Sequence, residues 1–199
     1  MTDLLLATRN RGKQQEFRRL LAGVSGRVVV PQEIGLDLEV PEPHDTYAEN
    51  ASAKARAFCR VAQLPVLADD SGIEVAALDW GPGVRSARFG EPGRDGADLL
   101  LERLAGASDR RARMVCWLAL AVPPPTAADE PHIELFSGMV EGEVAPDRRG
   151  TGGFGYDPIF LLPTGLTTAE LGEGEKDRIS HRGRAVAAAL PRLRQILDG

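Results

Sequence analysis

Short apolar runs alternate with helical patterns along this chain of 199 residues, and this alternation limits the folds open to it. Residues 4–7 form an apolar run suited to a buried strand. The next apolar residues, Phe17, Leu20, Leu21 and Val24, follow helical spacing. A strand that leads through a loop into a helix is typical of α/β proteins, so the start of the chain favours that class.

The rest of the chain continues the alternation. Thr46 followed by Glu49 fits a capping box, which predicts a helix over 47–62. A strand at 66–68 leads into a polar DDSG sequence, and an extended segment follows at 73–78. We expect further strands at 28–30, 114–122 and 159–162, and one or two strands over 133–144. We also expect a loop in PPPTAADEP and helices after Asp95, at AEL and after Ser180. The sequence therefore predicts an elongated α/β fold with a central mixed sheet flanked by helices, in one domain over 1–199.

Composition narrows the functional classes. The chain is 43% hydrophobic and 27% charged, with a net charge of −5, so it has no general attraction for nucleic acid polymers or anionic membranes. No apolar stretch approaches the roughly 20 residues that span a bilayer, and the amino-terminal sequence lacks the features of a signal peptide. Cys59 and Cys116 lie in apolar sequence and belong to no metal-binding motif, which favours buried thiols in a reducing cytoplasm.

Charge is distributed unevenly. Residues 33–49 carry six acids and no Lys or Arg, whereas basic residues cluster at 9–13 and 176–184. A site for a nucleoside polyphosphate with Mg²⁺ needs hard oxygen ligands for the metal and cations for the remaining phosphate charge. Both kinds of group are present in separate segments, although solvated surface stretches would have the same composition.

The loop TRNRGK follows the first predicted strand. In open α/β sheets, ligands bind beyond the carboxyl ends of strands, and helix starts favour phosphate. Thr8 and Asn10 can donate hydrogen bonds there, and Lys13 carries a positive charge. A helix simply capped by Asn10, with Lys13 in solvent, is the structural alternative. The loop is no P-loop, because GxxxxGK[ST] is absent.

Asp69 and Asp70 follow the strand expected at 66–68, and Ser71-Gly72 comes next. Because side chains alternate along a strand, we expect one carboxylate to face a ligand while the other caps or orients the loop. Capping of the turn by both acids is the structural alternative.

Two further segments contain candidate site residues. GTGGFGYDP includes a literal GxGxxG, but no strand precedes it and no helix follows, so it is not a dinucleotide-binding fingerprint. Its glycines around Phe154 favour a close approach to a flat ligand on which the ring can stack, or else a tight turn with the ring in the core. EKDRISHRGRA brings Lys176, His181 and Arg182 near a helix start, where they can donate hydrogen bonds to a base or a phosphate.

Four segments together resemble the Ham1-like family of non-canonical purine nucleoside triphosphate pyrophosphatases. They are TRNRGK, ADDSGIEVAAL with GPGVRSAR, GTGGFGYDPIF, and AEL with EKDRISHRGRA, in family order over almost the whole chain. The resemblance implies two lobes around a substrate cleft, a homodimer, and Mg²⁺-dependent hydrolysis of ITP, dITP or XTP to the monophosphate and pyrophosphate in the cytoplasm.

The resemblance also implies roles for residues near the phosphates. Thr8, Asn10 and Lys13 would bind the triphosphate, and Asp70 would be the catalytic acidic residue and a Mg²⁺ ligand. Glu42 would be the second metal ligand, although EPHDTYAENA stands where the family often has E-T-G-x-T-F-x-E-N-A. Arg9 occupies a position where many members have Gly.

The other implied residues surround the nucleoside. They are Ser71 as a substrate contact, Phe154, Gly155, Tyr156, Asp157 and Lys176 as the lining of the nucleotide site, and His181 and Arg182 as the groups that recognise the base. Two alternative functions remain: a non-catalytic nucleotide sensor using the same residues, and a Maf-type phosphohydrolase, against which the long GTGGFGYDPIF and SHRGRA matches argue.

Overall fold

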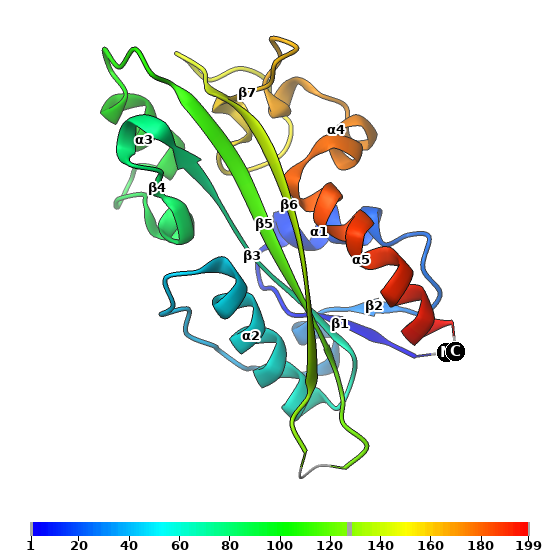
Figure 1. Ribbon diagram of the computed structural model, residues 1–199. Helices are drawn as coiled ribbons and strands as arrows, with labels where there is room; N and C mark the ends of the chain where they lie inside the picture. The colour runs from blue at the N-terminus through cyan, green and yellow to red at the C-terminus, as the bar shows by residue number, and fades with distance from the viewer. Residues whose placement is uncertain (1, 127–128, 199) are drawn as a thin grey trace. The chain divides into compact units, whose positions relative to one another are not determined.

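The computed structural model describes residues 2–126 and 129–198 and has a mixed α/β fold (Figure 1). Its strands are β1 (Leu4–Leu6), β2 (Val28–Val29), β3 (Val66–Val75), β4 (Gly81–Pro82), β5 (Arg111–Val122), β6 (His132–Val144) and β7 (Phe160–Leu161). Its α-helices are α1 (Arg11–Leu20), α2 (Tyr47–Ala62), α3 (Gly96–Arg103), α4 (Glu173–Ile179) and α5 (His181–Leu197). Short 3₁₀ turns are η1 (Pro31–Ile34), η2 (Ala76–Leu78), η3 (Gly83–Arg88), η4 (Asp157–Ile159) and η5 (Thr168–Glu170).

The described strands form one sheet in the order β2-β1-β3-β5-β6-β7, with β4 paired to β3. The strand β1 runs parallel to both β2 and β3, with Leu5 opposite Val29 on one side and Val66 on the other. The pairs β3–β4 and β6–β7 are antiparallel. The predicted mixed sheet of an α/β protein is therefore confirmed, while the elongated outline, the cleft and the single domain over 1–199 stay predictions.

The chain divides into two compact units. The first unit contains the described residues of 1–70, 117–137 and 185–199, and the second contains 71–116 and 138–184. In the first unit, α2 lies on one side of β1 and β3, and α1 and α5 lie on the other (Figure 1). Leu5, Val66 and Ala68 from the strands pack with Ala55 and Phe58 of α2 in a buried cluster, so hydrophobic burial on this face holds α2 to the sheet.

The second unit has its own core. Ile73 and Val75 of β3 pack with Leu100 of α3, Val140 of β6 and Phe160 of β7. The apolar stripe of α3 and the inward positions of the strands meet there, so the second unit buries a continuous apolar cluster independently of the first.

The helix predicted over 47–62 is confirmed with both ends in place. The hydroxyl oxygen of Thr46 accepts a hydrogen bond from the backbone N–H of Glu49 at 3.3 Å and donates one to its carboxylate at 2.6 Å. At the other end Gln63 adopts a left-handed conformation with φ 53°, before Pro65. Local interactions set both ends of this helix, which explains why the sequence alone locates it.

One predicted boundary is wrong, and one helix was missed. We expected strand 66–68 to end at a DDSG loop, but β3 continues without interruption to Val75. The helix α4 was not expected, since a seven-residue helix flanked by Gly172 leaves little periodic signal. The last helix starts at His181 as expected and continues through Pro191 to Leu197. Part of the expected PPPTAADEP loop, residues 127–128, lies outside the described residues.

Over residues 2–126 and 129–198, none of the helices combines the length and apolar character that crossing a bilayer requires.

Candidate active site

Strand alternation separates the two adjacent acids. Asp69 and Asp70 both lie within β3 and are almost fully buried, at 0% and 5% exposure. Because successive side chains of a strand point to opposite faces, Asp70 shares the face of Ala68, which packs against α2. Asp69 points to the other face, where it meets Lys13 of α1. The two carboxylates therefore have different partners and different environments.

Asp69 forms an ion pair with Lys13. The Lys13 ammonium lies 2.9 Å from the Asp69 carboxylate. Lys13 is held there by the start of α1, where the Asn10 side-chain oxygen accepts a hydrogen bond from the Lys13 backbone N–H at 3.0 Å. Thr8 in turn accepts a hydrogen bond from the backbone N–H of Asn10 at 3.3 Å. Asn10 is thus the helix cap that the structural alternative supposed, but Lys13 is paired rather than in solvent.

Arg9 points away from this arrangement. Its guanidinium forms an exposed ion pair with Asp37 and a longer hydrogen bond, 3.4 Å, to the carbonyl oxygen of Leu38. The cation that replaces glycine therefore contacts the segment after η1.

Asp70 receives a hydrogen bond from α2. The side-chain amide of Asn50 donates to the Asp70 carboxylate at 3.0 Å, and Asn50 is itself 1% exposed. Burial raises the pKa of Asp70, which the hydrogen bond from Asn50 opposes. The negative charge of Glu42 adds to the increase in this pKa, so Glu42 lies close enough to Asp70 for the two charges to interact.

Lys54 lies among the carboxylates of the first unit. Its ammonium forms an ion pair with Glu42 and donates a hydrogen bond to the backbone carbonyl of Asp69 at 2.9 Å. Burial alone would lower the pKa of Lys54, but the charges of Asp69, Glu42 and Asp70 outweigh burial and raise this pKa. One ammonium group therefore brings three acids from two parts of the sequence into a single electrostatic cluster.

This cluster fits a magnesium ion on a polyphosphate. When all are ionised, the carboxylates of Glu42, Asp69 and Asp70 exceed the ammonium groups of Lys13 and Lys54 by one negative charge. Among the described residues no group of three or more His, Cys, Asp or Glu side chains has the arrangement of a complete metal site. Mg²⁺ commonly binds through one or two carboxylates and completes its octahedron with water and substrate phosphates. The donors Glu42 and Asp70 suit that mode.

The candidate residues of the second unit centre on a buried ion pair. The Lys176 ammonium lies 2.6 Å from the Asp157 carboxylate, and these side chains are only 6% and 3% exposed. The same carboxylate accepts hydrogen bonds from the Phe154 backbone N–H at 2.7 Å and from the Thr168 hydroxyl at 2.8 Å. Asp157 therefore joins α4, η5 and the glycine-rich loop.

At two positions of that loop, neighbouring protein atoms leave no room for a side chain. A Cβ at Gly150 would lie 2.5 Å from the Ala169 backbone, and one at Gly153 would lie 2.1 Å from the Asp157 carboxylate. Both glycines also have positive φ, 77° and 69°. Contacts within the protein therefore require glycine at both positions, and the approach of this loop to a flat ligand stays a prediction. Gly155, with φ 61°, has nothing within 4 Å of an added Cβ.

Phe154 is half-buried, and two cations lie near its ring. The Lys176 ammonium and the Arg182 guanidinium carbon each lie 5.5 Å from its ring centroid, within the range of cation–π attraction. The neighbouring Tyr156 turns the other way, because its hydroxyl donates a hydrogen bond to the carbonyl of Ser86 at 2.8 Å and its ring packs against the second core. Burial raises the pKa of Tyr156, so its hydroxyl stays protonated.

His181 and Arg182 begin α5 and are nearly buried, at 4% and 3% exposure. The Arg182 guanidinium donates a hydrogen bond to the Ser71 hydroxyl at 3.1 Å. A close crossing of α4 and α5 sets this position, because a Cβ at Gly183 would lie 1.8 Å from the carbonyl oxygen of Asp177. Arg182, Ser71 and Phe154 are thus brought together in the second unit.

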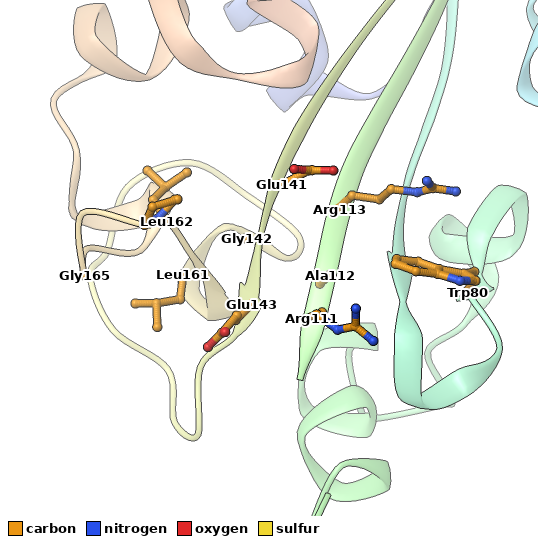
Figure 2. Close-up of a pocket in the computed structure, with 11 residues that line it drawn as sticks. Trp80, Arg111, Ala112, Arg113, Glu141, Gly142, Glu143, Leu161, Leu162 and Gly165 are labelled. Atoms are coloured by element: carbon orange, nitrogen blue, oxygen red, sulfur yellow. The ribbon is translucent and has the colours of Figure 1, made fainter. Parts of the chain in front are cut away.

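A separate groove of about 610 Å³ also lies in the second unit (Figure 2). The Arg113 guanidinium carbon stands 4.6 Å from the Trp80 ring centroid, and Arg113 is ion-paired with Glu74. None of the sequence-predicted site residues lines this groove, so its volume does not identify the nucleotide site. Its lining comprises Trp80, Arg111, Ala112, Arg113, Glu141, Gly142, Glu143, Leu161, Leu162, Pro163 and Gly165.

Sequence reasoning missed Asn50 and Lys54. The two residues lie four positions apart on α2, beside the apolar stripe of Ala51, Ala55 and Phe58. Polar side chains that border a buried stripe one helical turn apart share a helix face, which is a weak signal that they act together.

Residues 4–192 match the sequence profile of the Ham1 family. This chain belongs to the Ham1 family. Two relatives named dITP/XTP pyrophosphatase, from Chromobacterium violaceum and Symbiobacterium thermophilum, are each 48% identical to it. The first alignment covers 98% of both chains, and the second covers 98% of this chain and 96% of the relative.

Solved structures of Ham1 proteins have the same fold. A HAM1 protein from Coxiella burnetii superposes with a TM-score of 0.80 at 37% identity, over 100% of this chain and 99% of the other. The structure described as nucleoside-triphosphatase or dITP/XTP pyrophosphatase from Mycobacterium abscessus has a TM-score of 0.68 at 42% identity, over 97% and 100% of the two chains. The predicted family and the α/β fold of this Ham1 protein are confirmed.

Proposed function

We propose that this protein is a pyrophosphatase that hydrolyses dITP, XTP and ITP to the nucleoside monophosphate and pyrophosphate. The full-length relatives named dITP/XTP pyrophosphatase support the activity. The observation that carries the proposal is the convergence of Glu42 and Asp70 around Lys54. In the reaction a water oxygen bonds to the α-phosphorus, the bond from this phosphorus to the oxygen bridging to the β-phosphate breaks, and pyrophosphate leaves.

Glu42 and Asp70 would hold the Mg²⁺ ion. When bound, Mg²⁺ supplies positive charge against the phosphate oxygens. Asp70 orients the attacking water and accepts its proton. Lys13 and Lys54 hold the negative charge of the triphosphate, and Thr8 and Asn10 shape the loop from which Lys13 extends.

Base selection is proposed for the second unit. Arg182 and His181 donate hydrogen bonds to the 6-keto edge of hypoxanthine or xanthine, and Phe154 stacks on the base. Adenine presents an amino donor at that edge, so a buried protein donor would lose its partner. Mismatches of this kind discriminate between substrates by roughly 10⁴-fold. Asp157 and Lys176 support the loop that carries Phe154.

The test measures pyrophosphate release over a panel of nucleoside triphosphates, with inorganic pyrophosphatase and a phosphate dye, with and without Mg²⁺. We expect Mg²⁺-dependent release from dITP, XTP and ITP and little from ATP. Asp70→Asn should lower kcat by about 10²-fold or more, while the exposed control Asp147→Asn leaves it unchanged. Equal kcat/KM on ATP and ITP would refute the selectivity, and binding without pyrophosphate release would indicate a sensor instead.

The oligomeric state and the compartment complete the proposal. We propose a homodimer, which sedimentation analysis would show as twice the chain mass of 21.4 kDa. We also propose a cytoplasmic location, which the two buried cysteines and a nucleotide-pool substrate support.

A further inference from the structure

We propose that Asn50 is a positioning residue that holds the Glu42 segment and the Asp70 carboxylate in one fixed relation, so that both can bind the same divalent cation. This inference rests on the proposed function, because it concerns the metal site of that reaction. It adds a residue to which neither the motifs nor the chemistry above assigned a role.

The first turn of α2 makes Asn50 rigid. Its backbone N–H donates to the Thr46 carbonyl at 3.2 Å, directly after the cap that starts the helix. The side chain is 1% exposed and makes three hydrogen bonds. Because the helix start and the buried environment restrict Asn50, its amide holds the groups to which it is hydrogen-bonded in fixed positions.

Two of these bonds hold the segment that carries Glu42. The Asn50 side-chain oxygen accepts from the His44 backbone N–H at 3.0 Å, and its amide nitrogen donates to the His44 carbonyl at 3.1 Å. Only Pro43, with its ring-locked φ, separates His44 from Glu42. By holding the His44 backbone, Asn50 therefore restricts the position of the Glu42 backbone two residues earlier.

The third bond reaches the other carboxylate. The same Asn50 amide nitrogen donates to Asp70 at 3.0 Å, from 20 positions away in the sequence. The orientation of the amide is unambiguous, since only its nitrogen can donate to a carboxylate and a carbonyl while its oxygen accepts from an N–H. One planar group thus connects the two proposed metal ligands.

This arrangement also explains why the unusual residues around Glu42 are tolerated. Asn50 contacts the backbone of His44, and the His44 side chain is exposed. The bonds therefore do not depend on the side chain at position 44, provided that the position keeps its N–H. His44→Gly should retain them, whereas His44→Pro would lose one.

The experiment compares Asn50→Leu with the wild-type protein. Leucine has a similar volume but can make none of the three bonds. The control is Ser52→Ala on the same helix, where the hydroxyl donates a hydrogen bond to the Ala48 carbonyl at 2.7 Å. Asn50→Ser is the second variant, because a shorter polar side chain cannot reach Asp70 yet adds no apolar group beside it. Circular dichroism melts establish which variants are folded.

The first readout is Mn²⁺ binding, followed by electron paramagnetic resonance in the presence of a non-hydrolysable dITP analogue. Loss of a group that orients metal ligands typically costs about 10–100-fold in metal affinity or activity. We therefore expect both Asn50 variants to bind Mn²⁺ about 10–100-fold more weakly than wild type and Ser52→Ala. The Mg²⁺ concentration for half-maximal dITP hydrolysis should rise by a similar factor, while KM for dITP at saturating Mg²⁺ changes by less than about threefold.

Unchanged Mn²⁺ affinity in a folded Asn50 variant would overturn the proposal, even if that variant melted at a lower temperature. Mn²⁺ binding does not require turnover, so it tests Asn50 separately from the function. If wild type binds Mn²⁺ but releases no pyrophosphate from dITP, XTP or ITP, the proposed function fails while the role of Asn50 is still decided by the variants.

Discussion

Replacing Asp157 by Asn should destabilise the protein substantially, although the two side chains have nearly the same shape. Asparagine keeps an oxygen that can accept from the Phe154 N–H, but it removes the negative charge that faces Lys176. Lys176 is 4% exposed, so its ammonium would remain charged in a buried place with only dipoles around the former carboxylate. Buried charges that lose their partner are costly because water cannot replace it.

The expected size follows from this geometry. Breaking a buried ion pair by removing one partner lowers the free energy of unfolding by about 3–5 kcal/mol. For Asp157→Asn we expect a loss of about 3 kcal/mol, because the amide still accepts hydrogen bonds. For a chain of this length each kcal/mol lowers Tm by about 2–4 °C, so Asp157→Asn should lower Tm by about 6–12 °C. Urea unfolding measures the free energy of unfolding, and calorimetry measures Tm.

Two further variants make the reasoning refutable. The exposed Asp147→Asn should change stability by no more than about 0.5 kcal/mol, because solvent surrounds that carboxylate. Adding Lys176→Met to Asp157→Asn removes the buried charge that faced the Asp157 carboxylate and should recover most of the lost stability, which a double-mutant cycle reports as strong coupling. A loss below about 1 kcal/mol in Asp157→Asn, or simple additivity in the double variant, would show that the pair does not carry this energy.

Two other predictions concern a thiol and a helix crossing. Burial raises the pKa of Cys59 to about 11, and its thiol donates to the Leu64 carbonyl at 3.4 Å. The folded state therefore favours the protonated thiol, and only about 0.1% of Cys59 is thiolate at pH 8. Alkylation by iodoacetamide should be at least about 100-fold slower than for an exposed cysteine. The free energy of unfolding should fall as pH rises from about 9 to 11, because the unfolded chain loses this proton at lower pH than the folded protein. Rapid native-state labelling of Cys59, measured by mass spectrometry, would contradict this. Gly183→Ala should cost about 1–3 kcal/mol by forcing α5 away from the Asp177 carbonyl, and should reduce discrimination between ITP and ATP. The open position Gly174 serves as its control, where alanine should be neutral or stabilise by about 0.4–1 kcal/mol in the same melts.

Features determined by neighbouring residues could be predicted from the sequence. The helix over 47–62 depends on the Thr46–Glu49 capping box and on a periodic apolar stripe, both contained within the segment itself. The start of α1 likewise depends on Asn10 and the N–H of Lys13, three residues apart. The chemical types needed for a metal and a polyphosphate were also visible, because carboxylates and lysines keep their chemistry in any fold.

Only the tertiary structure decided how these groups are paired. β3 continues through the DDSG sequence because both buried carboxylates have partners there. Asp69 forms an ion pair with Lys13 on one face of the strand, and Asp70 accepts a hydrogen bond from Asn50 on the other. Asn50 and Lys54 likewise contact partners in other segments, Asp70 for Asn50 and Glu42 for Lys54, which the sequence does not indicate. The physical reason is that a buried polar side chain is stabilised only by the partner that the fold places within hydrogen-bonding distance, and this distance bears no relation to separation along the chain.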